Sequence, residues 1–318
     1  MNPTSLKLKL RGARKVLWLL IPFILLGAYL YKPEVNQQPT TNPSTSSGQD
    51  NQQLEKTAEI SLSIRPENPI QGEPVLVSVK NLSGTSMIRS VVFNDKPLGV
   101  FDNSALIGID LRQTTGSYPI ILTLSDGRTI KRNLTVGTRT IVKAPLGIPQ
   151  KLGGNTPEAE GKLLNSLVKE GIIINSVKSG PAKLWSGKFR YPLNGEIIIT
   201  DVYGYSRITG GSTIAHKGTD FRAATGTPVY AMNSGKVAFT DYLRNYGNTI
   251  IIDHGLGLMT IYMHLSEIDV KVGDMVEKGK LIGKSGDTGY VLGPHLHITV
   301  RINGISIDPM KFMALLGE

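Results

Sequence analysis

The stretch GPHLHITV, residues 293–300, carries two of the five histidines of this chain, and they stand two positions apart. In an extended strand, side chains at positions i and i+2 point to the same face. If this apolar stretch is a strand, His295 and His297 therefore project side by side into one space. The alternative is a short strand with two polar residues on its solvent face, and the pair alone does not separate these interpretations.

The composition restricts the chemistry that these histidines could serve. The chain has 318 residues and no cysteine, a length that allows about two domains with connectors. A metal would therefore be held by histidine and carboxylate, and a thiol nucleophile is excluded. About half of the net charge of +10 lies in residues 1–35, and the remainder contains no basic motif interleaved with aromatic residues. We therefore expect no nucleic-acid partner.

The basic N-terminus precedes VLWLLIPFILLGAYLY, residues 16–31, which contains no charged side chain. As a helix this segment would span roughly 24 Å, which is close to the thickness of a bilayer core. We expect residues 1–32 to form a cytoplasmic flank and a single-pass membrane anchor, with the rest of the chain in the cell envelope, outside the cytoplasm. A cleaved signal peptide is the alternative, although cleavage after Ala28 would place Leu26 where a small residue is required.

Residues 33–57 are rich in Gln, Asn, Ser, Thr and Pro and almost without apolar side chains, which predicts a disordered linker. Residues 58–139 instead alternate apolar and polar side chains in short runs. Two of these runs flank the dipeptide Asp126-Gly127, which is a strong hairpin signal. Short strands at this spacing resemble an immunoglobulin-like β-sandwich domain, with a role in spacing or binding.

Residues 140–187 form a connector in which TPEAEGKLLNSLVKEG, residues 156–171, predicts one short helix. Pro157 would lie in its first turn and Gly171 would end it.

The last third of the chain contains all five histidines. His216 and Asp220 are spaced HxxxD in AHKGTDF, and His264 follows the apolar run in IYMHLS. Taken singly, the first motif is also typical of a surface histidine beside a solvated carboxylate, and the second of a histidine in a core. Imidazole and carboxylate are, however, also the ligands that suit zinc.

HxxxD, the lone histidine and GPHLH occur in this order within a Gly-rich β pattern, and together they resemble the lysostaphin-type (LytM-type) zinc metallopeptidases, which are peptidoglycan endopeptidases. The resemblance covers residues 188–313 and includes VKVGDMVEKGKLIGKSGDTGYVLGPHLH, residues 270–297. It implies a mainly β chain with a C-terminal, duplicated-hybrid-motif-like antiparallel β peptidase domain over residues 188–318. The full expected fold adds the immunoglobulin-like β-sandwich and the N-terminal transmembrane helix.

By this resemblance, His216, Asp220 and His297 would bind one zinc ion per peptidase domain, and His264 and His295 would be catalytic. Three protein ligands leave the fourth tetrahedral position open, as in catalytic zinc sites. Two uncoordinated imidazoles could transfer a proton and stabilise a developing oxyanion. The sequence leaves open which imidazole is the base.

Some positions near these motifs are ambiguous. The family often has Phe and Glu where this chain has Ile298 and Thr299, and loss of the Glu could remove a group that orients a metal ligand. Tyr205 and Arg207 either face the substrate or pack internally. The resemblance implies no metal-binding or catalytic role for His254, and we expect this residue to be structural or solvated.

The expected function is that of an exported zinc endopeptidase that hydrolyses peptide cross-links of peptidoglycan, either D-alanyl cross-links or glycine bridges. A non-catalytic scaffold or activator of other wall hydrolases is the alternative, although all five family positions are present. The stretch VKVGDMVEKGKLIG, residues 270–283, also looks like the hammerhead of biotinyl or lipoyl carriers. No lysine lies in the hairpin context that those carriers modify, so we interpret this likeness as shared architecture.

Overall fold

The structure of the chain is a computed structural model, and it describes residues 60–82, 85–209 and 211–318. The membrane anchor expected at residues 16–31 and the linker expected at residues 33–57 lie outside these ranges. Within the described ranges, no helix has the length and apolar character that a membrane crossing requires.

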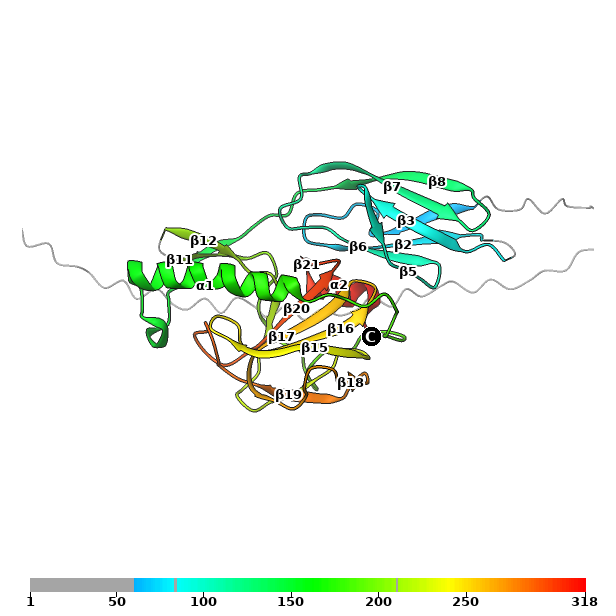
Figure 1. Cartoon of the computed structure of the whole chain (residues 1–318). Coiled ribbons are helices and arrows are strands. Elements are labelled where there is room, and N and C mark those ends of the chain that lie inside the picture. Colours follow the sequence, from blue (N-terminus) through cyan, green and yellow to red (C-terminus); the bar gives the residue numbers. More distant parts are fainter. Residues whose placement is uncertain (1–59, 83–84, 210) are drawn as a thin grey trace, which may run out of the picture. The chain divides into compact units, whose positions relative to one another are not determined.

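Residues 60–136 fold into two four-stranded antiparallel sheets, with strand orders β1-β2-β6-β5 and β4-β3-β7-β8 (Figure 1). The alternating apolar side chains of both sheets form one hydrophobic core. Asp126 and Gly127 lie in the turn between the last two strands, which confirms the predicted hairpin. The strands are β1 (Ser61–Arg65), β2 (Pro74–Lys80), β3 (Ile88–Phe93), β4 (Lys96–Leu98), β5 (Val100–Phe101), β6 (Ser104–Gly108), β7 (Gly116–Leu124) and β8 (Thr129–Val136).

The connector contains the short strand β9 (Lys143–Pro145), a 3-10 helix (Gln150–Leu152) and the helix α1 (Pro157–Ser176). The side chain of Thr156 caps α1 by accepting a hydrogen bond from the backbone N–H of Ala159. The prediction that Gly171 ends this helix is wrong. Gly171 does not adopt the left-handed conformation of a helix terminus, and α1 continues because Ile174 is buried in an apolar cluster with strand residues further along the chain.

The C-terminal part is built on a ten-stranded sheet with the main order β10-β13-β20-β17-β16-β15-β18. β19 pairs with β14 and β17, and β21 pairs with β20. Its strands are β10 (Ile199–Asp201), β13 (Thr219–Phe221), β14 (Pro228–Tyr230), β15 (Gly235–Leu243), β16 (Gly247–Gly255), β17 (Leu258–Ile268), β18 (Met275–Val276), β19 (Leu281–Ser285), β20 (Leu296–Ile302) and β21 (Ile305–Ile307).

A smaller sheet and a second helix complete this part of the chain. β11 (Ser206–Thr209) pairs with β12 (Ser212–Ala215) and, in parallel, with β9 of the connector. The helix α2 (Pro309–Leu316) is capped by Asp308, whose carboxylate accepts hydrogen bonds from the backbone N–H groups of Met310 and Lys311. The described chain is therefore mainly β, as the sequence predicted, while the domain boundaries remain predictions.

The connector helix α1 is held against the C-terminal sheet by polar and apolar contacts. The buried carboxylate of Glu170 accepts hydrogen bonds from the backbone and side-chain amides of Asn245. Leu163 belongs to a buried apolar cluster with Tyr290, which lies just before the GPHLH motif. As a result, α1 forms one wall of the region in which the conspicuous histidines gather.

Candidate metal centre

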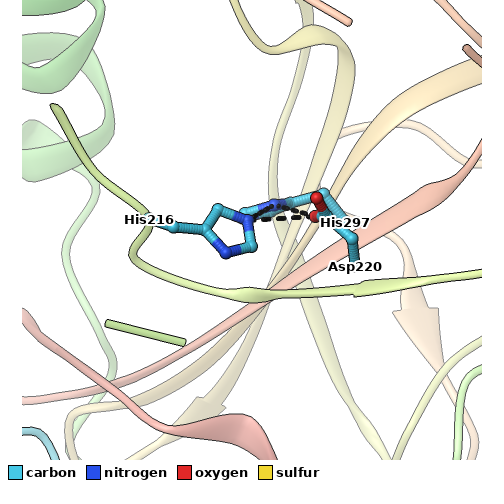
Figure 2. Close-up of side chains that lie close together, drawn as sticks. All are labelled: His216, Asp220 and His297. Carbon is cyan, nitrogen blue, oxygen red and sulfur yellow. Dashed lines mark hydrogen bonds and ion pairs between the residues drawn. The ribbon is translucent and has the colours of Figure 1, made fainter. Parts of the chain in front are cut away.

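Three of the side chains singled out in the sequence converge at one point of the ten-stranded sheet (Figure 2). β13 pairs antiparallel with β20, and the register places Asp220 opposite His297. His216 lies in the short loop between β12 and β13, so its ring reaches the same point. All three residues are buried, and we call them the His-Asp-His cluster.

The three possible ligand atoms of the cluster are in close contact. Asp220 Oδ1 lies 3.1 Å from His216 Nε2 and 2.7 Å from His297 Nδ1. The two imidazole nitrogens are 3.0 Å apart. If all three atoms present lone pairs, as the surrounding hydrogen bonds indicate, this spacing favours a cation between them.

Each imidazole of the cluster has its other nitrogen occupied by a hydrogen-bond acceptor. His216 Nδ1–H donates to the carbonyl oxygen of Val202 at 2.9 Å. His297 Nε2 lies 3.0 Å from the hydroxyl oxygen of Thr299, and this hydroxyl donates to the carbonyl oxygen of Lys217. Because the proton of the Thr299 hydroxyl is used by that carbonyl, His297 Nε2 must be the donor. These contacts leave His216 Nε2 and His297 Nδ1 unprotonated and directed at Asp220.

The protonation state of His297 agrees with this pattern. Burial lowers the pKa of His297 to about 4, so its imidazole is neutral near pH 7. A carboxylate and two imidazole lone pairs are a donor set that fits zinc, with an open position for a substrate.

Arg207 fixes the second oxygen of the Asp220 carboxylate. Its Nη2 lies 3.0 Å from Asp220 Oδ2 and 2.8 Å from Asp201 Oδ2. The sequence left open whether Arg207 and Tyr205 face the substrate or pack internally. The guanidinium of Arg207 is paired with two carboxylates inside the protein, and the backbone carbonyl of Tyr205 accepts the N–H of His216. Arg207 therefore supports the cluster through its side chain, and Tyr205 supports it through its backbone.

Gly218, in the middle of the HxxxD motif, is needed for the approach of β20 to the cluster. A Cβ atom at this position would lie 2.3 Å from His297 Nε2 and 2.4 Å from the carbonyl oxygen of Ile298. Any larger residue would therefore push His297 away from Asp220. The sequence analysis did not predict a role for Gly218. Its position between His216 and Asp220 in the HxxxD motif could have indicated one.

His264 and His295 stand beside the cluster with their rings 4.9 Å apart between centroids. His264 Nδ1–H donates to the carbonyl oxygen of Thr288, and His295 Nδ1–H donates to that of Gly293, each at 2.9 Å. Both imidazoles therefore keep Nε2 free to accept a proton. His295 Nε2 lies 3.6 Å from Asp220 Oδ2, so this nitrogen is close to the cluster without being one of its three converging atoms.

His264 reaches this place through an unusual backbone conformation. Its φ is +64°, in the left-handed region that non-glycine residues rarely adopt. Successive residues of a regular strand point to opposite faces, yet Met263 and His264 of β17 both line the cavity beside the cluster. Burial, followed by the effect of His295, holds the pKa of His264 well below its usual range. Its imidazole is therefore neutral at neutral pH.

His254 is separate from this group. It is fully buried, and its two ring nitrogens contact the carbonyl oxygen of Ser234 and the hydroxyl of Thr260. Burial lowers its pKa to about 4. Of the two expectations for this residue, the structural one fits these contacts.

Residues 214–309 match the model of peptidase family M23, so the chain contains an M23 peptidase domain, as the resemblance of its motifs predicted. Over 202 residues, or 60% of the chain, it is 34% identical to the peptidoglycan DD-endopeptidase ShyA of Vibrio cholerae. Over 126 residues, or 36% of the chain, it is 43% identical to lysostaphin of Staphylococcus simulans. These matches cover 46% and 25% of the two relatives, so the chain spans less than half the length of either.

A solved structure described as a peptidase M23 from Pseudomonas aeruginosa is similar over a larger share of the chain. The two share 25% sequence identity with a TM-score of 0.56, and the match covers 77% of this chain and 94% of that one. The fold around the cluster is therefore an M23 peptidase β fold.

Proposed function

We propose that the chain is a zinc-dependent endopeptidase that hydrolyses peptide cross-links of bacterial cell-wall peptidoglycan. The observation that carries this proposal is the convergence of two imidazole lone pairs and a carboxylate beside two further imidazoles with free Nε2 atoms. The M23 domain and the relatives named as peptidoglycan endopeptidases support the same function.

In this proposal the residues divide into ligands and proton-transfer groups. His216 Nε2, Asp220 Oδ1 and His297 Nδ1 would hold the zinc ion. When bound, zinc supplies Lewis-acid activation of water and of the scissile carbonyl. His264 and His295 would accept, hold and return protons at Nε2, since both keep Nδ1–H directed at a backbone carbonyl. An imidazole that has taken up a proton at Nε2 can then stabilise negative charge that develops on the substrate oxygen.

The proposed role also needs export and attachment. We propose that residues 16–31 anchor the chain in the membrane and that the domains after residue 32 lie outside the cytoplasm, where peptidoglycan is found. The two-sheet domain of residues 60–136 is proposed to be immunoglobulin-like. Its orders β1-β2-β6-β5 and β4-β3-β7-β8 correspond to strands ABED on one sheet and a CFG sheet with one added strand.

The test of this function is digestion of purified peptidoglycan by the full-length chain loaded with zinc. We expect cross-linked fragments to be converted to uncross-linked ones, as identified by mass spectrometry. Removal of the metal with a chelator should stop the reaction, and added zinc should restore it. Peptidoglycan binding without cleavage, by a chain that retains no zinc, would instead favour the scaffold or activator alternative.

Thr299 provides a finer test of the ligand assignment. Thr299→Val keeps the side-chain shape but leaves His297 Nε2–H without its acceptor, so zinc affinity should fall by roughly 10- to 100-fold. The measurement is a competition titration of zinc against a chelator of known affinity. Thr299→Ser retains a hydroxyl and should restore most of the affinity. If the valine variant binds zinc as tightly as the wild type, Thr299 does not orient His297.

A further inference from the structure

The ring and the backbone of His216 are both held by one short segment, residues 202–205. His216 Nδ1–H donates to the carbonyl oxygen of Val202 at 2.9 Å. The backbone N–H of His216 donates to the carbonyl oxygen of Tyr205 at 2.7 Å, and its own carbonyl oxygen accepts the N–H of Gly204 at 2.9 Å. The position of residues 202–205 therefore sets the direction of His216 Nε2, one of the three converging atoms of the cluster.

This segment is in contact with an arginine that follows the two-sheet domain. Arg139 lies shortly after the end of β8, and its Nη1 donates to the carbonyl oxygen of Tyr203 at 3.4 Å. The central carbon of its guanidinium lies 5.2 Å from the centroid of the Tyr203 ring. At the next residue, a Cβ atom on Gly204 would lie 3.1 Å from Arg139 Cδ. Arg139 thus contacts two consecutive residues of the segment 202–205.

Arg139 is itself fixed by the two-sheet domain and by the cap of α2. Its Nε donates to the carbonyl oxygen of Gln71 at 2.7 Å, and its backbone N–H donates to Gln71 Oε1 at 3.2 Å. Its Nη2 pairs with Asp308 Oδ2 at 2.9 Å, and the two side chains are only 13% and 11% exposed, so water screens this ion pair little. A guanidinium can make all these contacts together because its donors form a rigid planar fork.

The carbonyl group that accepts His216 Nδ1–H belongs to a residue with little packing of its own. The side chain of Val202 is 53% exposed, so it restrains the backbone only weakly. Tyr203 is buried, and its hydroxyl donates to the carbonyl oxygen of Ser306 at 2.7 Å, which anchors the far end of its side chain. The hydrogen bond from Arg139 acts instead on the backbone of Tyr203, directly after the Val202 carbonyl.

We propose that Arg139 is a positioning residue of the metal centre, which fixes the backbone of residues 202–205 and, through that backbone, the direction of His216 Nε2. The acceptor of the second ring nitrogen orients a histidine ligand, and Arg139 holds the segment that provides this acceptor. The two-sheet domain thereby contributes to metal binding through its contacts with Arg139. This inference rests on the proposed function in taking the His-Asp-His cluster as the zinc site.

The test measures the zinc affinity of full-length variants by competition with a chelator of known affinity. Arg139→Met keeps an apolar stem over Gly204 and removes every side-chain donor. We expect its zinc affinity to fall roughly fivefold to tenfold, near the lower end of the effect of groups that orient a ligand. Arg139→Lys keeps the charge and can pair with Asp308. One ammonium cannot reproduce the planar fork, so this variant should recover only part of the loss.

Lys183→Gln is the matched control. Lys183 forms an ion pair with Asp102 of the two-sheet domain, and its ammonium lies over the rings of Phe101 and Trp185. Its removal weakens the attachment of the two-sheet domain at a place where residues 202–205 take no part. We therefore expect Lys183→Gln to bind zinc as tightly as the wild type, even if thermal unfolding shows that it has lost stability.

A second measurement needs no metal. In the metal-free chain, NMR can follow the exchange of the His216 Nδ1 proton with water, which reports directly on the hydrogen bond to Val202. This exchange should be faster in Arg139→Met than in the wild type and unchanged in Lys183→Gln. A role of Arg139 in stability alone would not produce that difference between two variants that each lack an ion pair of the two-sheet domain.

Wild-type zinc affinity in Arg139→Met would overturn the inference. An equal loss of affinity in Lys183→Gln would overturn it as well, because any weakening of the attachment would then have the same effect. A wild-type chain that binds no zinc at the cluster would contradict the proposed function instead. In that case the exchange of the His216 proton in the metal-free chain still decides whether Arg139 positions this ring.

Discussion

A His297→Ala chain is expected to lose almost all of its bound zinc and, with it, the hydrolysis of cross-linked peptidoglycan. The substitution removes Nδ1, which lies 2.7 Å from Asp220 Oδ1 and 3.0 Å from His216 Nε2. The two remaining ligands rarely retain zinc against water and buffer, so affinity should fall by more than about 100-fold. The measurements are metal content after dialysis and release of fragments from peptidoglycan.

Two comparisons separate loss of the ligand from loss of the fold. Circular dichroism should show the same β-rich spectrum for His297→Ala as for the metal-free wild type. Thr299→Ser, which changes the neighbouring residue on the same strand face but keeps its hydroxyl, should remain zinc-loaded and active. Normal zinc occupancy in His297→Ala would show that the metal is held by other residues, and the assignment of the His-Asp-His cluster would be wrong.

The sequence could predict which residues meet because their motifs depend on local spacing. The strand period places His295 and His297 on one side of the chain, and in the structure both stand near Asp220. The hairpin at Asp126-Gly127 was likewise predicted, since turn chemistry is local. The resemblance to a known family then predicted that HxxxD, His264 and GPHLH form one site. Local spacing alone could not predict this, because the motifs extend over 82 positions of the chain.

Features that depend on contacts between distant segments could not be predicted in this way. The hydroxyl of Thr299 acts as the acceptor for His297 only because the backbone carbonyl of Lys217 takes up its proton. The left-handed backbone of His264 lies where the register between β16 and β17 shifts, between the pairs Asn248–Leu265 and Ile250–Tyr262. Similarly, Gly171 looked like a helix end because the burial of Ile174 beyond it depends on strands that come later in the sequence.

A second large effect is expected when the two imidazoles beside the cluster are removed. His264→Ala and His295→Ala should each keep nearly normal zinc content, while hydrolysis drops by roughly 10²- to 10⁴-fold, the usual contribution of acid-base and oxyanion groups. The geometry gives the reason for this difference. His295 Nε2 lies 3.6 Å from Asp220 Oδ2, outside the three converging atoms, and the centroid of the His264 ring is 5.9 Å from that of His297.

The double variant tests whether these imidazoles act on the same substrate. Both Nε2 atoms would transfer protons at one reacting centre. The fold-loss of hydrolysis in His264→Ala/His295→Ala should therefore be far smaller than the product of the two single losses. Multiplicative losses would instead indicate independent roles. The decisive comparison is the metal content of the single variants. If His295→Ala loses its zinc while His297→Ala keeps it, then His295 is the ligand and His297 is the proton-transfer group, the reverse of the present assignment. The hydrogen bond from His297 Nε2–H to Thr299 argues against that exchange, since it leaves Nδ1 as the lone pair that meets Asp220.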